Sequence, residues 1–303
     1  MIKPFKSGFI TIMGRPNVGK STLLNTLLEQ KISIVSSVPQ TTRFQLRGIL
    51  NEKNTQLVFV DTPGIHLFKE KFSYHLNKVS LASLEGIDLI LYVVDVNRRP
   101  GKEEEKIIDI IAKQKSKVIM VLNKVDLGKK YMSSYIELWQ EKIEMIKKLD
   151  SLEYYIPTSA LTKINIEQLK SAILELIPEG KPFYDKDALT DFPDKYRAGD
   201  IIREKIFLKT KQEIPHAVAV EVKEIQKKER SVYILAHIYI QRDSQKKIII
   251  GKDGTLLKEI GTEARRELED MYKKKVFLDL WVKTEKDWQS NPRLLQDLGY
   301  WIS

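Results

Sequence analysis

The motif GRPNVGKS, at positions 14–21, constrains the fold more than any other part of this sequence. It matches the pattern GxxxxGK[ST] and stands between an apolar strand-like run at 9–13 and a segment of helical period at 21–29. Gly14 and Gly19 let backbone N–H groups turn inward without a clashing Cβ, and the helix adds its positive end. The sequence therefore predicts an α/β fold built around a strand–turn–helix unit that can cradle a phosphate chain.

Short apolar runs alternate with segments of helical period up to about residue 180. This alternation favours parallel βαβ units, so we expect a mostly parallel sheet with helices on both faces. Pro178, Gly180 and Pro182 then interrupt the pattern, and we place a domain boundary there, between a first domain at 1–180 and a second at 181–303. The expected strands lie at 9–13, 57–60, 89–95, 118–122 and 155–157, and the expected helices at 21–29, 101–114 and 164–176.

The second domain has a different pattern. Two runs of period-two alternation, 217–225 and 232–241, flank a charged turn and predict an antiparallel hairpin. The expected element order is helix, strand, strand, helix, helix, strand, which makes a smaller α+β domain. Trp281, in the alternating final strand, is expected in the core. The segments outside the hairpin are a helix at 196–211, an amphipathic helix at 255–272 and a strand at 276–282.

Composition excludes several classes of protein. The chain has no Cys, so disulfides, thiolate zinc sites and cysteine nucleophiles are excluded, and a reducing compartment is expected. No run of about 18 apolar residues is present, and the first residues carry no signal-peptide core. The net charge of +10 suggests a polyanionic partner, but the excess is spread along the chain, so its site must be a local patch.

The side chains of Lys20, Ser21 and Asp61 suit phosphate and metal binding. Lys20 would neutralise the β and γ phosphates of a nucleotide, and the Ser21 hydroxyl would hold Mg²⁺. Asp61 follows a buried apolar run and opens the sequence DTPG. A buried carboxylate needs a cation or donors, which Mg²⁺ would supply. Gly64 would then offer its N–H to the γ-phosphate.

The sequence NKVD, at positions 123–126, indicates a preference for guanine. Asp126 can accept the two donors on the N1 and N2 edge of guanine, whereas adenine presents the opposite polarity there. Asn123 can reach the N7 and O6 side, and the stem of Lys124 can lie along the ring. Ser159 and Ala160, after a later strand, can place a backbone N–H near O6. We therefore expect GTP and GDP as ligands.

Residues 248–254, IIIGKDG, look like a KH motif with a GxxG loop. Glycines at both ends of such a loop let a nucleic-acid backbone approach, and the element order is similar to the type II KH arrangement. A plain helix-turn-helix packing device is the alternative. The predicted RNA-binding residues are Lys247, Ile250, Gly251, Lys252, Asp253, Gly254 and Lys258.

These motifs together resemble the translation-factor-like GTPases, and GRPNVGKS with PQTTR at 39–43 is similar to their Era-type branch. The resemblance implies that Thr42, or alternatively Thr41, completes the Mg²⁺ shell beside Ser21 and Asp61, and that Asn17 holds a K⁺ ion. Ile65 follows DTPG where Ras-like proteins have a glutamine, so slow intrinsic hydrolysis is expected. The predicted catalytic residues are Asn17, Lys20, Thr42 and Gly64. The predicted nucleotide-binding residues are Gly14, Asn17, Val18, Gly19, Lys20, Ser21, Thr22, Asp61, Gly64, Asn123, Lys124, Asp126, Ser159 and Ala160.

The resemblance also implies a biological role. Era-type proteins bind the 3′ end of small-subunit (16S) ribosomal RNA through the KH domain and assist maturation of the small ribosomal subunit. The resemblance further implies a monomer in the cytoplasm, with peripheral association at the cytoplasmic face of the inner membrane as an alternative. A pure RNA-binding assembly protein with an inactive nucleotide pocket is a second alternative, against which the intact motif residues argue.

Overall fold

The computed structural model describes residues 4–36, 46–61, 84–146, 151–210 and 214–300, without the side chain at 216. Contacts divide these residues into two compact units, one with residues 4–33 and 46–191 and the other with residues 34–36 and 192–300. The division falls after Asp191, whereas the expected boundary lies after Gly180. Within the described residues, no helix is both long and apolar enough to cross a membrane.

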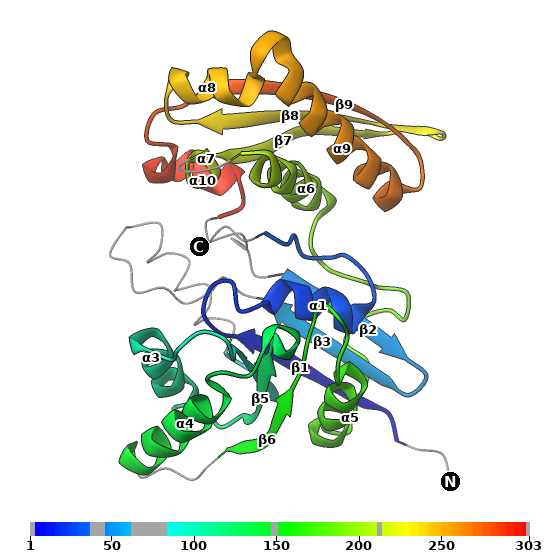
Figure 1. Ribbon diagram of the computed structural model, residues 1–303. Coiled ribbons are helices and arrows are strands. Elements are labelled where there is room, and N and C mark those ends of the chain that lie inside the picture. The colour runs from blue at the N-terminus through cyan, green and yellow to red at the C-terminus, as the bar shows by residue number, and fades with distance from the viewer. Residues whose placement is uncertain (1–3, 37–45, 62–83, 147–150, 211–213, 301–303) are drawn as a thin grey trace. The chain divides into compact units, whose positions relative to one another are not determined.

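The first unit is built on a six-stranded sheet in the order β2-β3-β1-β4-β5-β6 (Figure 1). β1 pairs in parallel with β3 and β4, and β4, β5 and β6 continue the parallel pairing, while β2 is antiparallel to β3. This arrangement confirms the mostly parallel sheet. The strands are β1 (Lys6–Met13), β2 (Leu46–Glu52), β3 (Thr55–Asp61), β4 (Leu89–Asp95), β5 (Lys117–Asn123) and β6 (Leu152–Pro157).

Helices cover both faces of this sheet (Figure 1). α3 (Lys102–Ile111) and α4 (Met132–Ile146) contact each other and share a core with alternate residues of β4 and β5. α1 (Lys20–Leu28) and α5 (Ile166–Leu176) contact each other on the other side. β4 is buried along its whole length, as expected for a strand covered on both faces.

Residues 181–191 belong with the first unit because they bind its outer strands. The Gln56 side-chain oxygen accepts the N–H groups of Phe183 and Tyr184 at 2.6 and 2.9 Å. The Thr190 hydroxyl donates to the Arg47 carbonyl at 2.6 Å. The last helix of the unit ends just before Pro178 and Gly180, as expected. The first unit nevertheless extends to Asp191, because these side-chain contacts hold residues 181–191 against it.

The second unit has a three-stranded sheet in the order β7-β8-β9. β7 and β8 form the expected antiparallel hairpin, and β9 is parallel to β8. The elements confirm the predicted order, with α8 ending in the apolar segment before the GxxG loop. They are α6 (Asp194–Lys209), α7 (Ile214–Ala217), β7 (Ala219–Lys227), β8 (Ser231–Ile240), α8 (Asp243–Ile250), the 3-10 turn η2 (Lys252–Gly254), α9 (Thr255–Tyr272), β9 (Lys275–Thr284), η3 (Trp288–Ser290) and α10 (Pro292–Asp297).

The core of the second unit lies between the sheet and helices α6, α8 and α9. Ile234, Ala236 and Ile238 of β8 are fully buried there. The alternate positions face the other side of the sheet. Trp281 occupies such a position on β9 and is 57% exposed, so the expectation that it lies in the core is wrong.

Candidate functional site

The turn after β1 requires glycine at two positions. Gly14 has a φ of 155°, and a Cβ built there would lie 2.2 Å from the Val93 carbonyl oxygen. Gly19 has a φ of 100°, and its Cβ would lie 2.4 Å from the Asn123 side-chain nitrogen. A side chain at Gly14 would therefore displace β4, and one at Gly19 would displace the Asn123 side chain at the end of β5.

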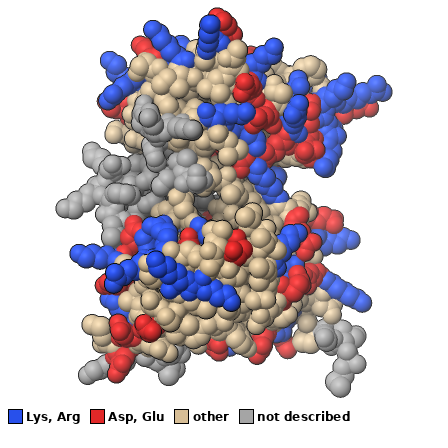
Figure 2. All heavy atoms as spheres, in the orientation of Figure 1, with Lys and Arg blue, Asp and Glu red and all other residues tan. Residues whose placement is uncertain are grey.

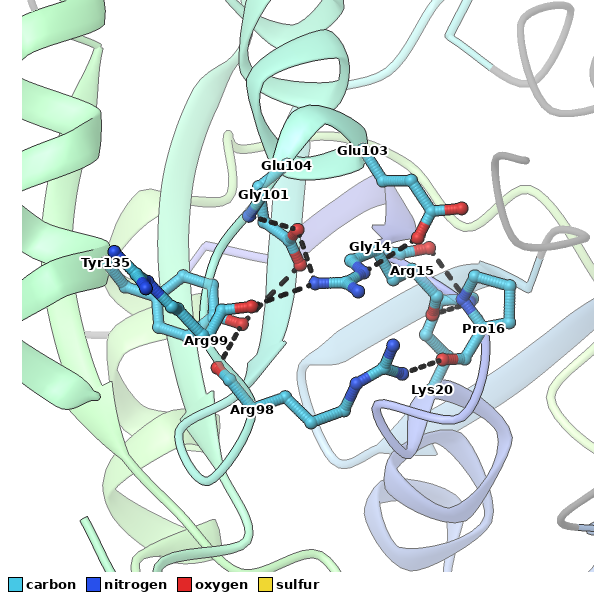
Figure 3. Close-up of polar contacts among 10 residues, drawn as sticks. All are labelled: Gly14, Arg15, Pro16, Lys20, Arg98, Arg99, Gly101, Glu103, Glu104 and Tyr135. Carbon is cyan, nitrogen blue, oxygen red and sulfur yellow. Dashed lines mark hydrogen bonds and ion pairs between the residues drawn. The ribbon is translucent and has the colours of Figure 1, made fainter. Parts of the chain in front are cut away.

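Lys20 folds back over this turn (Figure 3). Its ammonium donates to the carbonyl oxygens of Gly14 at 3.0 Å and Arg15 at 2.8 Å. Burial lowers the pKa of Lys20 to about 8, and the nearby Asp61 carboxylate acts in the opposite direction. The cation is thus held at the centre of the turn, where a phosphate chain would meet the inward N–H groups.

Ser21 and Asp61 are brought together as predicted. The Ser21 hydroxyl donates to Asp61 Oδ2 at 3.0 Å, and Asp61 is fully buried at the end of β3. The Ser33 hydroxyl, which no sequence motif predicted, donates to the same oxygen at 2.9 Å. Hydroxyl and carboxylate oxygens are ligands that Mg²⁺ prefers, so this donor set fits that ion. Thr42, Thr41 and Gly64 lie outside the described residues.

Asn123 connects three loops at the carboxyl edge of the sheet. Its Nδ2 donates to the Val18 carbonyl at 2.8 Å, and its Oδ1 accepts the Ala160 N–H at 3.0 Å. The side chain is 1% exposed. Asn123 therefore holds the phosphate-loop and 158–160 segments in register, in addition to its predicted contact with a base. Ser159 is fully buried and its hydroxyl accepts the Thr162 N–H at 3.1 Å.

Lys124 and Asp126 differ in their exposure. Lys124 Nζ donates to the Asn17 carbonyl at 2.7 Å and pairs with Asp95 at 2.8 Å, so its stem spans from one loop to the other. Asp126 lies in the 3-10 turn η1 (Val125–Leu127) and is exposed. Its carboxylate is accessible to a ligand beside the stem of Lys124. Thr22, the last of the predicted nucleotide-binding residues, lies in the first turn of α1.

Arg15, inside the phosphate-binding turn, anchors that turn to α3 (Figure 3). Its guanidinium pairs with Glu103 at 2.9 Å and with Glu104 at 2.6 Å. Glu104 is 1% exposed and also accepts the Gly101 N–H at 3.2 Å. Burial raises the pKa of the Glu104 carboxyl, and Arg15 opposes that shift. No sequence motif predicts this cluster, because Arg15 and Glu104 lie 89 positions apart.

The GxxG loop of the second unit also depends on its glycines. Gly251 has a φ of 75°, and a Cβ there would lie 2.8 Å from the Leu256 Cβ. Gly254 has a φ of 76°, but its Cβ would meet no described atom within 4 Å. Lys252 and Asp253, between them, are exposed. The outer side of the loop is therefore open to an approaching chain.

A groove of about 700 Å³ begins at this loop. Gly254 and Lys258, both predicted, line it, whereas Lys247 and Ile250 lie at the end of α8. On the face drawn in Figure 2, basic and acidic side chains are interspersed, as expected from the spread charge. The lining residues that sequence reasoning missed are Tyr233, Leu257, Gly261, Thr262, Arg265, Val276, Phe277, Leu278, Asp279 and Leu280.

Comparisons with known proteins agree with both sites. A family model described as a 50S ribosome-binding GTPase matches residues 9–124, and a KH domain model matches residues 213–289. GTPase Era of Geobacter metallireducens is 44% identical over 299 residues, covering 98% of each chain. GTPase Era of Ruminiclostridium cellulolyticum is 43% identical over 297 residues, again covering 98% of each.

Two solved structures are similar over nearly the whole chain. One is Era in complex with MgGDPNP and nucleotides 1506–1542 of 16S ribosomal RNA, and the other is a variant of Aquifex aeolicus Era bound to GDP.AlF4−. Each is 37% identical with a TM-score of 0.89, and each match covers 98% of this chain and 100% of the other. The KH prediction is confirmed over the packing-device alternative. The chain belongs to the Era family of GTPases, with a P-loop GTPase domain followed by a KH domain.

Proposed function

We propose that this chain is a GTP-hydrolysing switch that binds the 3′ end of small-subunit ribosomal RNA and assists assembly of the small ribosomal subunit. The observation that carries the proposal is the presence of two glycine-dependent backbone loops, one on each unit. The related Era structure holds MgGDPNP and a 16S ribosomal RNA segment together. The same two ligand chemistries fit the phosphate turn and the GxxG groove of this chain.

At the nucleotide site, Lys20 would contact the β and γ phosphates, and Ser21 and Asp61 would hold Mg²⁺. Mg²⁺ offsets the charge that develops on the transferred phosphoryl group. The 3.0 Å contact between Ser21 and Asp61 and the full burial of Asp61 support this assignment. Thr42 and Gly64 remain predicted contacts of the metal and the γ-phosphate.

At the base site, Asp126 would accept both donors of the guanine edge, and Lys124 would lie along the ring. The exposed carboxylate of Asp126 and the extended stem of Lys124 support these roles. An Asp126→Asn variant should lose GTP affinity, because its amide presents a donor to a guanine donor. Equal affinity of the variant and the parent for GTP would contradict the assignment.

Asn17 is proposed to hold K⁺ beside the phosphates. It stands in the turn with a positive φ of 65°. Hydrolysis should be faster in K⁺ buffer than in Na⁺ buffer, and an Asn17→Ala variant should lose the difference. Equal rates of GTP hydrolysis by the parent chain in the two buffers would contradict a K⁺ site at Asn17.

RNA binding is tested with a pair of matched glycine variants. Gly254 and Gly86 both have left-handed backbones, at φ of 76° and 68°, with no described atom within 4 Å of a built Cβ. Both substitutions to Asp therefore carry a similar backbone strain. Gly254→Asp should weaken binding to the 16S ribosomal 3′ end, and Gly86→Asp should not. An equal effect of the two would contradict RNA binding at the loop.

The switch itself predicts that RNA affinity differs between the GTP-analogue and GDP states, because a ligand shifts an equilibrium only through differential affinity. Identical affinities would exclude the switch. In cells, crosslinking followed by sequencing should enrich the small-subunit 3′ end. We place this activity in the cytoplasm, and sedimentation with liposomes of inner-membrane lipids tests the peripheral membrane alternative.

A further inference from the structure

The side of the β7-β8-β9 sheet that faces away from α6, α8 and α9 carries a row of aromatic side chains. We call this side the open face and define it by the odd-numbered positions of β8 and β9. The register places Tyr233 beside Phe277, His237 beside Trp281, and Tyr239 beside Lys283. The even-numbered neighbours are buried or partly buried in the core under the helices, so alternation fixes which side these residues face.

Two large aromatic side chains on the open face are accessible. Phe277 is 60% exposed and Trp281 is 57% exposed. They are four residues apart on β9, which at about 3.3 Å per residue separates them by about 13 Å. That separation allows two bases of an extended strand, with one nucleotide between them, to stack on the two rings.

The open face is continuous with the RNA groove. The groove begins at Gly254 and Lys258 but is also lined by Tyr233, Phe277 and Asp279, which are open-face residues. It therefore reaches across the β9 edge of the sheet. A strand held at the GxxG loop can continue along this path onto the rings.

The open face has lysines at both ends of its aromatic pair, and its acidic side chains are Glu221 and Glu224 on β7 and Asp279 on β9. Lys275 and Lys283 occupy the same side of β9 at either end of the aromatic pair, and both are exposed. The acidic Glu221 on β7 is buried and accepts bonds from Lys223 Nζ and the Tyr239 hydroxyl, both at 2.8 Å. Burial, with Lys283 and Lys223 nearby, lowers the pKa of His237.

Asp279, between the two rings, accepts the Tyr233 hydroxyl at 3.5 Å. It is the one acidic side chain on this side of β9, against two lysines. Cations at the ends of a row of rings are the combination that single-stranded nucleic acid requires, since bases stack on aromatic faces and phosphates need positive charge. An apolar surface of a partner protein would not pair with the flanking lysines.

We propose that the open face is a second RNA subsite, on which bases leaving the GxxG groove stack on Phe277 and Trp281 while Lys275 and Lys283 contact the phosphates. This inference rests on the proposed RNA-binding function and extends it beyond the groove. Each ring contributes through base stacking, which tolerates different bases.

The test compares a four-nucleotide RNA, which the GxxG loop can clamp, with a ten-nucleotide RNA extended on both sides of it. Both come from the 16S ribosomal segment and are titrated against the full chain by fluorescence anisotropy. Trp281→Ala should weaken binding of the long RNA by about tenfold and leave the short RNA unchanged, because Trp281 does not line the groove. Phe277→Ala should weaken binding of the long RNA by about tenfold as well. Trp281→Phe should restore most of the affinity.

A matched control is Leu208→Ala, which removes an equally exposed apolar side chain from α6, 61% exposed. It should leave both RNAs unaffected. If the parent binds neither RNA, the proposed function fails; if it binds both and the ring variants bind the long RNA as the parent does, only the second subsite fails. A concentration-dependent dimer in sedimentation velocity that Trp281→Ala abolishes, with RNA affinity unchanged, would identify a second copy as the occupant instead.

Discussion

Replacing Arg15 by Met should strongly destabilise the GTPase unit, although the residue is on the ligand-binding turn. The substitution keeps the aliphatic stem and removes the guanidinium, which now pairs with Glu104 at 2.6 Å and Glu103 at 2.9 Å. Glu104 is 1% exposed, so its carboxylate would lose its cation inside the protein.

Breaking a buried ion pair by removing one partner costs about 3–5 kcal/mol. The Gly101 N–H, 3.2 Å from Glu104, and the Tyr135 hydroxyl, at 3.5 Å, remain after the substitution. These two donors still stabilise the carboxylate, so we expect a loss at the lower end of this range, about 3 kcal/mol in the free energy of unfolding. Replacing Arg15 and Glu104 together by Met should recover the stability to within about 1 kcal/mol, because no buried charge is then left.

Urea denaturation of the full chain, read by hydrogen exchange of β4 and β5, isolates the GTPase unit from the KH unit. Glu103→Gln is the control, since that carboxylate is 24% exposed and its pair should contribute about 1 kcal/mol or less. A loss below about 1 kcal/mol for Arg15→Met would refute the reasoning. So would a double variant whose loss equals the sum of the two single variants, because contacting residues must couple.

Three further outcomes follow from single contacts. The raised pKa of the Glu104 carboxyl contributes stability that is present below the ordinary value of 4.5 and is lost as pH rises through the raised value. Glu104→Gln should remove this pH dependence from the free energy of unfolding measured in urea, and parallel pH profiles of the variant and the parent would contradict the prediction. Trp288→Ala should cost about 3–5 kcal/mol, because the ring is fully buried and donates to the Ala217 carbonyl at 2.8 Å; a loss below 1 kcal/mol of unfolding free energy would be inconsistent with that packing. Gly19→Ala should weaken GTP binding at least tenfold in calorimetry, since its Cβ would lie 2.4 Å from Asn123, and unchanged affinity would mean that the loop adjusts freely.

The parts of the site that the sequence predicted are those fixed by local geometry. Gly14 and Gly19 have backbones and neighbours that exclude a side chain, so their spacing carries structural information by itself. The ends of parallel strands meet at one edge, which is why Asp61 and Asn123 could be assigned to the same site.

The parts that the sequence did not predict depend on contacts between distant positions. Ser33 reaches Asp61 across 28 positions, and Arg15 reaches Glu104 across 89, with no motif to connect them. β2 was also missed, because it joins the sheet antiparallel through a hairpin that interrupts the βαβ pattern. α4 was missed as well. Its buried residues Tyr135, Trp139 and Ile143 follow helical spacing, but the segment carries no phosphate-binding motif.

The error at Trp281 has a physical cause that bears on function. β9 carries apolar residues on both of its sides, so alternation alone does not say which side the helices cover. α8 and α9 cover the side of β9 that carries Val276 and Val282, which leaves Phe277 and Trp281 exposed on an edge strand. Exposed aromatics on an edge invite aggregation unless a ligand covers them. Because the groove that starts at the GxxG loop is also lined by Phe277, RNA is the ligand that accounts for both the apolar surface and the lysines around it.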